Sequence, residues 1–200
     1  MQNDFLVKDN FLTENLKLNS FNFIEKKITK VKFNYNLKNI FITIKLLPEK
    51  NKYFGRGILK EKNCKFIDKE FHYYGFLKKA CIPKDCFEAI KKDAKGIANI
   101  AKTSLMINRF GLDNRIEKNK VKNLKKNWVL NYFKKKRGDK LVVKKYKKKV
   151  LGFLLIFKKK NKMIIDLIAL NKKYYGKNIA LELICFAQKK FFNKKTTVVA

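Results

Sequence analysis

Apolar residues occur in compact blocks along the last third of the chain. Three such blocks are LVVKKY at 141–146, VLGFLLIF at 150–157 and MIIDLIAL at 163–170, and lysine-rich stretches separate them. Apolar runs of this length, bounded by short polar connections, are typical of strands joined as hairpins. The pattern therefore predicts three consecutive antiparallel strands.

Helical spacing appears before and after these strands. Asp85 and Glu88 have the spacing of a capping box, and the apolar residues that follow predict a helix beginning near residue 85. A second helix is predicted over about 117–135, where apolar residues three or four apart form one stripe. A third helix is predicted from about 179 to 190, and TTVVA after it begins a further strand.

From about residue 117 the predicted order is thus helix, three strands, helix, strand. A strand–helix–strand crossover normally joins parallel neighbours, whereas the hairpin strands are antiparallel. We therefore predict an α/β fold of the α+β kind, with a mixed, mostly antiparallel sheet flanked by helices. Residues 1–95 are predicted to be a β-rich N-terminal region whose best strand is KNIFITIKLL, and residues 96–200 a second domain.

The formal net charge of +34 first indicates a nucleic-acid partner. However, the only arginines are Arg56, Arg109, Arg115 and Arg137, whereas proteins that read base edges rely on arginine. Lysine is spread along the whole chain beside much Asn, Ile and Phe, as expected from AT-rich coding. A solvated lysine surface is the favoured interpretation, and a lysine-rich nucleic-acid-binding protein remains the alternative.

Few residues in the sequence suit a metal site. The four cysteines show no CxxC pair, and His72 is the only histidine, so we expect no metal and mostly buried, reduced thiols. His72 is either a catalytic base or, more commonly for a lone histidine beside tyrosines, structural. No apolar stretch has the length of a membrane span and no signal peptide is visible, so we expect a cytoplasmic protein.

The segment ALNKKYYGKNIALEL at 169–183 joins the third strand to the last helix. A helix N-terminus presents unpaired N–H groups and a partial positive charge, which favour an anion. Gly176 and Ala180 are small enough to let backbone approach a phosphate, and Asn178 tolerates unusual backbone angles. The segment is therefore either a basic connection or a phosphate cradle.

This region resembles the GNAT family of acyl-CoA-dependent N-acetyltransferases. The family has a strand ending IAV, a short arm and then YRGKGIG opening a helix, where this chain has IAL at 168–170 and YYGKNIA at 174–180. It looks most like the amino sugar-nucleotide acetyltransferases related to dTDP-fucosamine acetyltransferase, because NRFGLD at 108–113 and WVLN at 128–131 match segments of that group. The resemblance covers about residues 95–200 and implies a GNAT-like fold.

The resemblance implies acetyl-CoA as co-substrate, with direct transfer to an amine. The pantetheine arm would pair with the backbone of Ile168, Ala169 and Leu170, and a strand N–H there would stabilise the thioester oxygen. The pyrophosphate would bind the turn formed by Tyr175, Gly176, Lys177, Asn178, Ile179 and Ala180. Tyr175 stands where the family has Arg or Gln, and Asn178 where it has Gly; both changes would weaken cofactor binding.

Asp166 is the nearest candidate for the catalytic base. On an alternating strand it would share a face with Ile164 and Ile168, and the alternative is a solvated aspartate facing a lysine. The family's acid is a tyrosine beyond the strand that TTVVA begins, and the chain ends at Ala200. We therefore expect either a fragment or a catalytically impaired family member.

The leading hypothesis is an acetyl-CoA-dependent N-acetyltransferase acting on a sugar-nucleotide amine in surface polysaccharide synthesis. A protein or small-amine N-acetyltransferase of the same fold is the second enzyme hypothesis. Arg109 is either a ligand for a nucleotide-sugar phosphate or a surface residue at a helix end, and Trp128 is expected to pack in the core. A homodimer is compatible with this interpretation, and no specific nucleic acid is expected.

Overall fold

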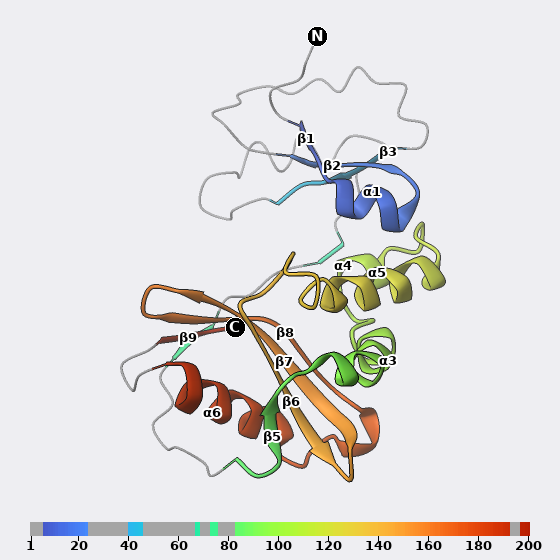
Figure 1. Cartoon of the computed structure of the whole chain (residues 1–200). Coiled ribbons are helices and arrows are strands. Elements are labelled where there is room, and N and C mark those ends of the chain that lie inside the picture. Colours follow the sequence, from blue (N-terminus) through green and yellow to red (C-terminus); the bar gives the residue numbers. More distant parts are fainter. Residues whose placement is uncertain (1–5, 24–39, 46–66, 69–72, 76–82, 193–196) are drawn as a thin grey trace. The chain divides into compact units, whose positions relative to one another are not determined.

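The computed structural model describes residues 6–23, 40–45, 67–68, 73–75, 83–192 and 197–200 (Figure 1). The chain forms two compact units, 1–68 and 69–200, whereas the sequence placed the domain boundary at residue 95. Strands at 74–75 and 86–88 belong to the sheet of the second unit. His72, a candidate catalytic base, lies outside the described residues.

The first unit contains a small sheet and one helix. Its elements are β1 (Leu6–Lys8), α1 (Asn10–Leu16), β2 (Asn19–Phe23) and β3 (Ile40–Thr43). β2 lies in the centre, antiparallel to β1 and parallel to β3. Asp9 caps α1, because its carboxylate accepts a hydrogen bond from the Leu12 N–H at 2.8 Å. The strand predicted in KNIFITIKLL is confirmed over the residues of β3.

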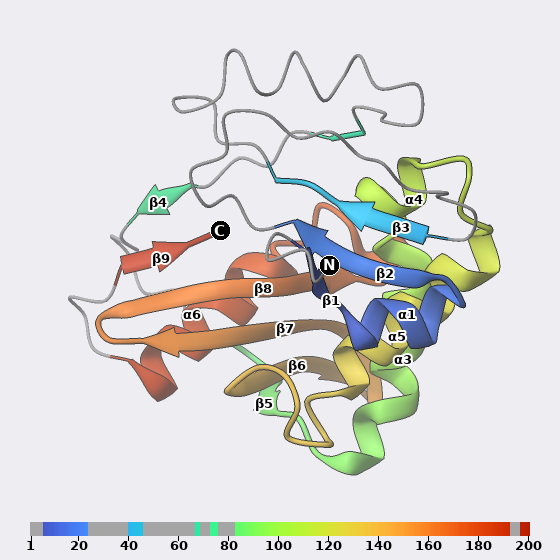
Figure 2. The same ribbon diagram turned by 90° about the horizontal axis from the view of Figure 1, so that it is seen from above.

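The second unit is built on a six-stranded sheet. Its strands are β4 (Tyr74–Gly75), β5 (Cys86–Glu88), β6 (Lys140–Tyr146), β7 (Lys149–Lys159), β8 (Lys162–Leu170) and β9 (Thr197–Val199). They lie in the order β4–β9–β8–β7–β6–β5 (Figure 2). Only the β8–β9 pair is parallel. The predicted mixed, mostly antiparallel sheet and its three hairpin strands are therefore confirmed.

Helices cover both faces of this sheet. They are α3 (Ala94–Ser104), α4 (Arg109–Leu112), α5 (Lys118–Leu130) and α6 (Ile179–Phe191), with single 3₁₀ turns η1 (Lys91–Asp93) and η2 (Lys172–Tyr174). Apolar residues of α3 and α5 pack with Phe153 and Leu155 of β7 on one face. Leu183 and Ala187 of α6 pack with Leu154 and Ile156 on the other. β7 is apolar along most of its length because it is buried on both faces.

The helix predicted from residue 85 is wrong in its start. Asp85 has a left-handed backbone with φ of 52°, and Cys86–Glu88 instead form β5, which pairs with Val142 to Lys144 of β6. α3 begins only at Ala94. It follows the turn η1, where Asp93 accepts a hydrogen bond from the Ile90 N–H at 3.0 Å. Pairing with a distant strand thus overrides the local helical spacing.

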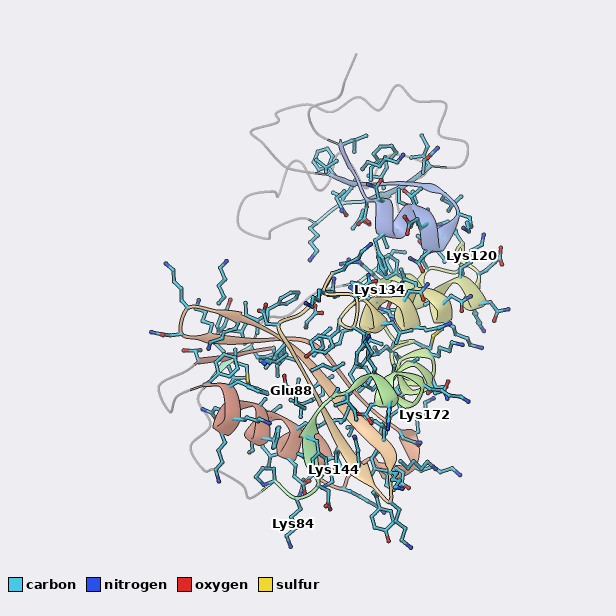
Figure 3. The ribbon with its side chains drawn as sticks, in the orientation of Figure 1. Lys84, Glu88, Lys120, Lys134, Lys144 and Lys172 are labelled. Atoms are coloured by element: carbon cyan, nitrogen blue, oxygen red, sulfur yellow. The ribbon has the colours of Figure 1, made fainter. Side chains whose placement is uncertain are left out.

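Ion pairs fix β5 and α6 to the edge of the sheet. Lys144 of β6 pairs with Glu182 in the first turn of α6, and its Nζ also donates to the Lys84 carbonyl at 3.0 Å (Figure 3). Lys140 pairs with Glu88 of β5 at 2.8 Å. The Lys144–Glu182 pair is partly buried, so it orients the N-terminal end of α6 more firmly than an exposed pair would, while the Lys140–Glu88 pair joins β6 to β5.

The structure describes two of the four cysteines. Cys86 and Cys185 are buried thiols outside any disulfide, as predicted, while the other two cysteines lie outside the described residues. Within the described ranges, no helix is both long and apolar enough to cross a membrane.

Gly152 of β7 offers a test of how α6 approaches the sheet. A Cβ there would lie 2.4 Å from Leu170 Cδ2, 3.1 Å from the Ala169 carbonyl oxygen and 3.4 Å from Ile179 Cγ2. We expect Gly152→Ala to lower the free energy of unfolding by about 1–3 kcal/mol, because the crowded backbone and side chains must move. Denaturant titration measures the change.

Gly75→Ala is the matched control, since a Cβ at this strand glycine meets no atom within 4 Å. We expect it to alter the free energy of unfolding by no more than about 0.5 kcal/mol. Equal effects at the two glycines would contradict the close packing of β7, β8 and α6.

Candidate functional site

The two edges of β8 are paired to different extents. Along one edge β8 pairs with β7 from Lys162 to Leu170. Along the other, β9 pairs only with Lys162, Met163 and Ile164. In the part of the chain that the structure describes, no strand pairs with this edge between residues 165 and 170, so a bound chain could add to it as a strand.

Hydrogen-bond alternation shows which residues face this open edge. The Asn171 N–H donates to the Leu151 carbonyl of β7 at 2.8 Å. Because hydrogen-bonded pairs alternate along an antiparallel ladder, Ala169 also directs its backbone polar groups toward β7, whereas Ile168 and Leu170 direct theirs to the open edge. The Ser104 hydroxyl confirms this for Leu170, since it donates to that carbonyl at 2.6 Å. Of the three predicted backbone partners, Ile168 and Leu170 are presented outward.

A β-bulge interrupts the ladder at Asp166. Leu155 pairs with Leu167 and Ile156 pairs with Ile165, so Asp166 has no partner opposite it. The extra residue reverses the alternation of faces. Ile168 and Ile165 therefore both lie on the α6 face. The prediction that Asp166 shares a face with Ile168 is wrong for this reason.

Asp166 is held by an arginine on the α5 side of the sheet. Its two carboxylate oxygens accept hydrogen bonds from Arg137 at 2.6 and 2.7 Å, and only 12% of its side chain is exposed. The alternative of a solvated aspartate facing a lysine is therefore also wrong. Arg137 in turn lies over the Trp128 ring, with its Cζ 4.5 Å from the ring centroid. The sequence analysis assigned no site role to Arg137.

The turn between β8 and α6 contains two left-handed residues. Gly176 has φ of 75° and Asn178 has φ of 54°. Asn178 is the N-cap of α6, but its side chain caps no backbone N–H, and its carbonyl accepts the first helical hydrogen bond from Glu182 at 3.0 Å. Within the described residues, the amides of 176 to 180 donate to no acceptor. Five consecutive N–H groups are thus available to an anion at the start of a 13-residue helix.

Side chains around this turn leave the amides uncovered. A Cβ at Gly176 would meet no atom within 4 Å, and Tyr175 is 54% exposed. Lys177 Nζ lies 5.5 Å from the Tyr174 ring centroid, so this lysine packs along the turn. Glu182 would repel an anion, but its pair with Lys144 offsets that charge. Ile179 is buried against the sheet while Ala180 is half-buried.

Comparisons with known proteins give similarities only at the level of solved structures. No model of a known family matches the sequence, and no curated protein is significantly similar to it.

Three solved structures illustrate these similarities. PaiA N-acetyltransferase from Thermoplasma acidophilum, in complex with coenzyme A, is 15% identical, with 52% of this chain and 69% of that chain covered and a TM-score of 0.39. A GNAT family acetyltransferase from Brucella melitensis, in complex with acetyl-CoA, is 14% identical, with 50% and 62% covered and a TM-score of 0.38. PH1933 from Pyrococcus horikoshii OT3 is 19% identical, with 60% and 70% covered and a TM-score of 0.40.

This chain therefore covers less than two thirds of the Brucella protein. Identities and TM-scores at this level assign no activity, so the function proposed below rests on the geometry of β8 and the turn that follows it.

A group of cations and rings lies beside the Asp166–Arg137 pair. Lys125 Nζ is 4.3 Å from the Trp128 ring centroid and 5.4 Å from that of Phe110, and Arg109 Cζ is 4.9 Å from Phe110. Lys125 is only 5% exposed. Sequence reasoning missed it, although it falls on the apolar stripe of α5. We call Arg109, Phe110, Lys125, Trp128, Arg137 and Asp166 the cation–ring cluster.

Burial lowers the pKa of Lys125 from 10.5 to about 7, because an ammonium ion loses its hydration there. The positive charges of Arg109 and Arg137 lower it further, and only Asp166 acts in the opposite direction. The amine of Lys125 therefore loses its proton at a lower pH than an ordinary lysine does.

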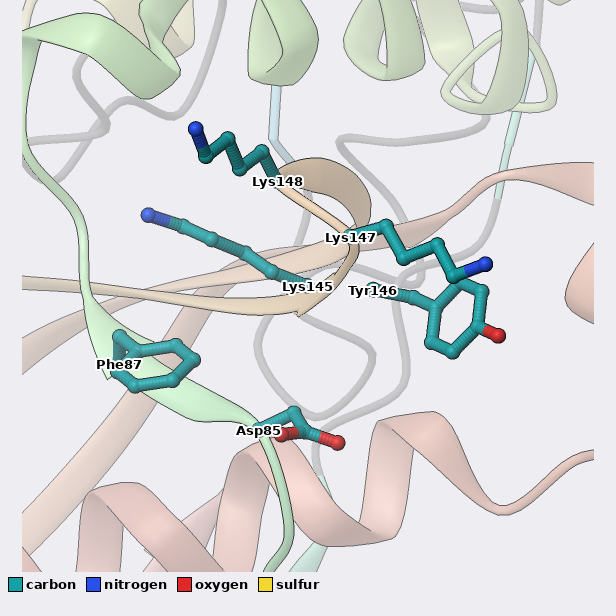
Figure 4. Close-up of a pocket in the computed structure, with 6 residues that line it drawn as sticks. All are labelled: Asp85, Phe87, Lys145, Tyr146, Lys147 and Lys148. Carbon is teal, nitrogen blue, oxygen red and sulfur yellow. The ribbon is translucent and has the colours of Figure 1, made fainter.

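A pocket of about 470 Å³ opens elsewhere, at the β6–β7 hairpin (Figure 4). Its lining residues are Asp85, Phe87, Lys145, Tyr146, Lys147 and Lys148. Lys145 is already paired with Asp93 at 2.7 Å. None of the predicted site residues lines this pocket. No group of three or more His, Cys, Asp or Glu residues in the described segments could hold a metal ion.

The low pKa of Lys125 makes stability depend on pH. Between about 7 and 10.5 the unfolded chain keeps this proton while the folded protein releases it. The free energy of unfolding therefore rises with pH in this window, by up to roughly 1 kcal/mol per pH unit. We expect Lys125→Met to flatten that rise between pH 7 and 9, as measured by denaturant titration.

Lys122→Met provides the control, because Lys122 is an exposed residue of the same helix. Its stability curve should run parallel to that of the parent protein. A Lys125→Met curve that also runs parallel would contradict a charge-destabilised lysine at this position.

Proposed function

We propose that this chain binds acetyl-CoA and transfers its acetyl group to an amine. One observation carries the proposal: the open edge of β8 leads directly into a turn with five free amides at the start of a long helix. A strand-like arm followed by a diphosphate suits this arrangement, because the arm needs backbone partners and the phosphates need N–H donors. Pantetheine joined to a pyrophosphate has this order of groups.

The pantetheine arm is proposed to pair with β8 through the N–H and carbonyl of Ile168 and the N–H of Leu170. The Leu170 carbonyl already accepts from Ser104, which leaves it a weaker partner. The pyrophosphate is proposed to bind the amides of Gly176, Lys177, Asn178, Ile179 and Ala180. The left-handed angles at Gly176 and Asn178 support this role, since alternating backbone angles turn successive N–H groups toward one point.

Direct transfer is the proposed chemistry at the thioester. The amine nitrogen attacks the carbonyl carbon, and a backbone N–H near the β8 bulge stabilises the oxygen as negative charge develops. One such donor contributes roughly 3 kcal/mol of transition-state stabilisation. Both oxygens of Asp166 are engaged by Arg137, so the geometry supports Asp166 as a positioning residue that fixes the bulge. Proton acceptance by Asp166 stays a prediction.

For the acceptor we propose an amine of a sugar-nucleotide, as the resemblance at 108–113 and 128–131 implies. The cation–ring cluster supports an anionic acceptor, because Arg109 and Arg137 place positive charge beside the bulge. A protein or small-amine acceptor is the alternative. Release of free CoA, measured with amino sugar-nucleotides, peptides and polyamines in parallel, distinguishes these classes.

The nucleic-acid hypothesis gains no support from β7. Phe153 is fully buried in the core, so it offers no ring on which a base could stack. We expect binding to random-sequence DNA to be purely electrostatic and to fall by about 10³-fold or more between 50 and 200 mM salt, provided that six or more phosphates are contacted. A sequence-selective complex that persists at 200 mM salt would contradict this expectation; filter binding measures it.

The turn itself is tested by substitutions that act in opposite directions on CoA affinity. Gly176→Val should abolish binding, because a β-branched residue resists a φ of 75°. Asn178→Gly should tighten binding or leave it unchanged, since glycine adopts a left-handed backbone without the cost of roughly 1–2 kcal/mol carried by other residues. Lys177→Glu should weaken CoA but not pantetheine, which lacks the phosphates.

Calorimetric titration with CoA and with pantetheine measures all three variants, and circular dichroism confirms that they fold. If folded Gly176→Val binds CoA as tightly as the parent protein, the turn is only a basic connection and the proposed function loses its main support.

A further inference from the structure

Lys125 occupies an unusual place for a lysine. It lies on the buried face of α5 with Val121, Leu124 and Val129, and only 5% of its surface is exposed. Lysine is seldom buried to this extent unless an acidic partner accompanies it. The position therefore requires an account of what this amine contacts.

The amine of Lys125 contacts aromatic rings in place of an acid. Its nearest described partners are the faces of Trp128 and Phe110, and no described residue accepts a hydrogen bond from it or forms an ion pair with it. Three charged groups face it: Arg109 from α4, Arg137 from the segment before β6, and Asp166 from β8. Arg137 already engages both oxygens of Asp166, so the only carboxylate among these three groups is occupied.

Burial and the two neighbouring guanidinium groups favour the neutral form of the amine, whereas the ring faces favour the ammonium ion. With its pKa lowered to about 7, Lys125 has a larger share of neutral amines at pH 7 than an ordinary lysine. An ordinary lysine with a pKa near 10.5 has roughly three neutral amines in ten thousand at the same pH. Lys125 is therefore expected to present a nucleophilic amine at neutral pH.

We propose that Lys125 is a covalent acylation site of this protein, with acetyl-CoA as the acyl donor. The identity of the donor rests on the proposed function, whereas the reactive amine rests on the surroundings of Lys125 alone. Lys125 and Arg137 both contact the Trp128 ring, so Lys125 lies one ring away from the Arg137–Asp166 pair at the β8 bulge.

The reaction balances without a further reagent. The lone pair of Nζ attacks the thioester carbonyl carbon, a C–N bond forms and the C–S bond breaks. The nitrogen loses one proton and the departing thiolate takes one, so the products are an N-acetyl-lysine and free CoA. The product is a neutral amide, which removes the cost of placing a third cation beside Arg109 and Arg137.

The first experiment measures the reactivity of the amine without any cofactor. The full chain is labelled with a trace of acetic anhydride at several pH values, and digestion followed by mass spectrometry gives the rate at each lysine. At pH 7 we expect Lys125 to react about tenfold or more faster than Lys122, the exposed lysine one turn earlier. Its rate should level off above pH 7, where the amine is neutral.

The second experiment replaces the anhydride with acetyl-CoA at pH 7.5. We expect one acetyl group per chain, located on Lys125. A Lys125→Met variant should carry none, because methionine has a side chain of similar length without an amine. Lys122→Met should be acetylated like the parent protein. CoA binding is measured on the same samples by calorimetry, so that failure of the donor and failure of the amine are separated.

Arg137→Gln tests the cause of the reactivity. This change removes one cation and frees Asp166 to pair with Lys125, so the amine should become protonated and its rate at pH 7 should fall about tenfold or more. Circular dichroism confirms folding of each variant. A merely accessible lysine would not respond in this way to a change at Arg137.

The outcomes are distinct. Preferential labelling of Lys125 by both reagents supports the proposal. Acetyl-CoA binding without acetylation of Lys125 overturns the proposal and leaves the proposed function standing. No binding of CoA, together with fast anhydride labelling, overturns acetyl-CoA as the donor and the proposed function but supports the reactive amine. Slower anhydride labelling of Lys125 than of Lys122 at pH 7 overturns the proposal whatever CoA does.

Discussion

The hydrogen-bonding requirement of β8 governs the arrangement of the second unit. A strand must satisfy N–H and carbonyl groups on both of its edges. β7 satisfies one edge along the whole length of β8, but β9 reaches only its first three residues. Ile168 is left with polar groups directed outward, beside a turn whose amides are also free. The outward polar groups of β8 and the free amides of the turn are adjacent because β8 leads directly into that turn.

The bulge at Asp166 adds a second constraint. One extra residue lets Ile165 and Ile168 both pack against α6, although three positions separate them. The same displacement sends the Asp166 carboxylate to the other face, where Arg137 holds it and Trp128 lies against Arg137. A local irregularity in one strand therefore connects the sheet to the buried face of α5. Lys125 contacts the same Trp128 ring, so the Asp166–Arg137 pair forms part of its surroundings.

Charge acts in two different ways in this protein. Most lysines that the structure describes are exposed and contribute to a general positive field, which attracts polyanions without selecting among them. A few cations are held in fixed positions, notably Lys144 against Glu182, Arg137 against Asp166 and Lys125 between two rings. Only fixed charges of this kind can discriminate between ligands or alter the chemistry of a neighbour, because their geometry is set before a ligand arrives.

The sequence by itself determined the elements whose pattern is local. The three hairpin strands, the α5 stripe and the turn with Gly176 and Asn178 follow from apolar period, helix signals and small residues, and the structure contains each of them. The sequence also predicted the parallel β8–β9 pair, because a strand–helix–strand crossover normally joins two parallel strands.

Only the tertiary structure decided the rest. Residues 86–88 became a strand because β6 offers them partners more than fifty residues away, which outweighs helical spacing. The face of Asp166 depended on a bulge that is visible only in the pairing with β7. The burial of Lys125 depended on Phe110, Trp128 and Arg137 meeting around it. Pairing register and burial are properties of residues distant in sequence, so no local pattern could specify them.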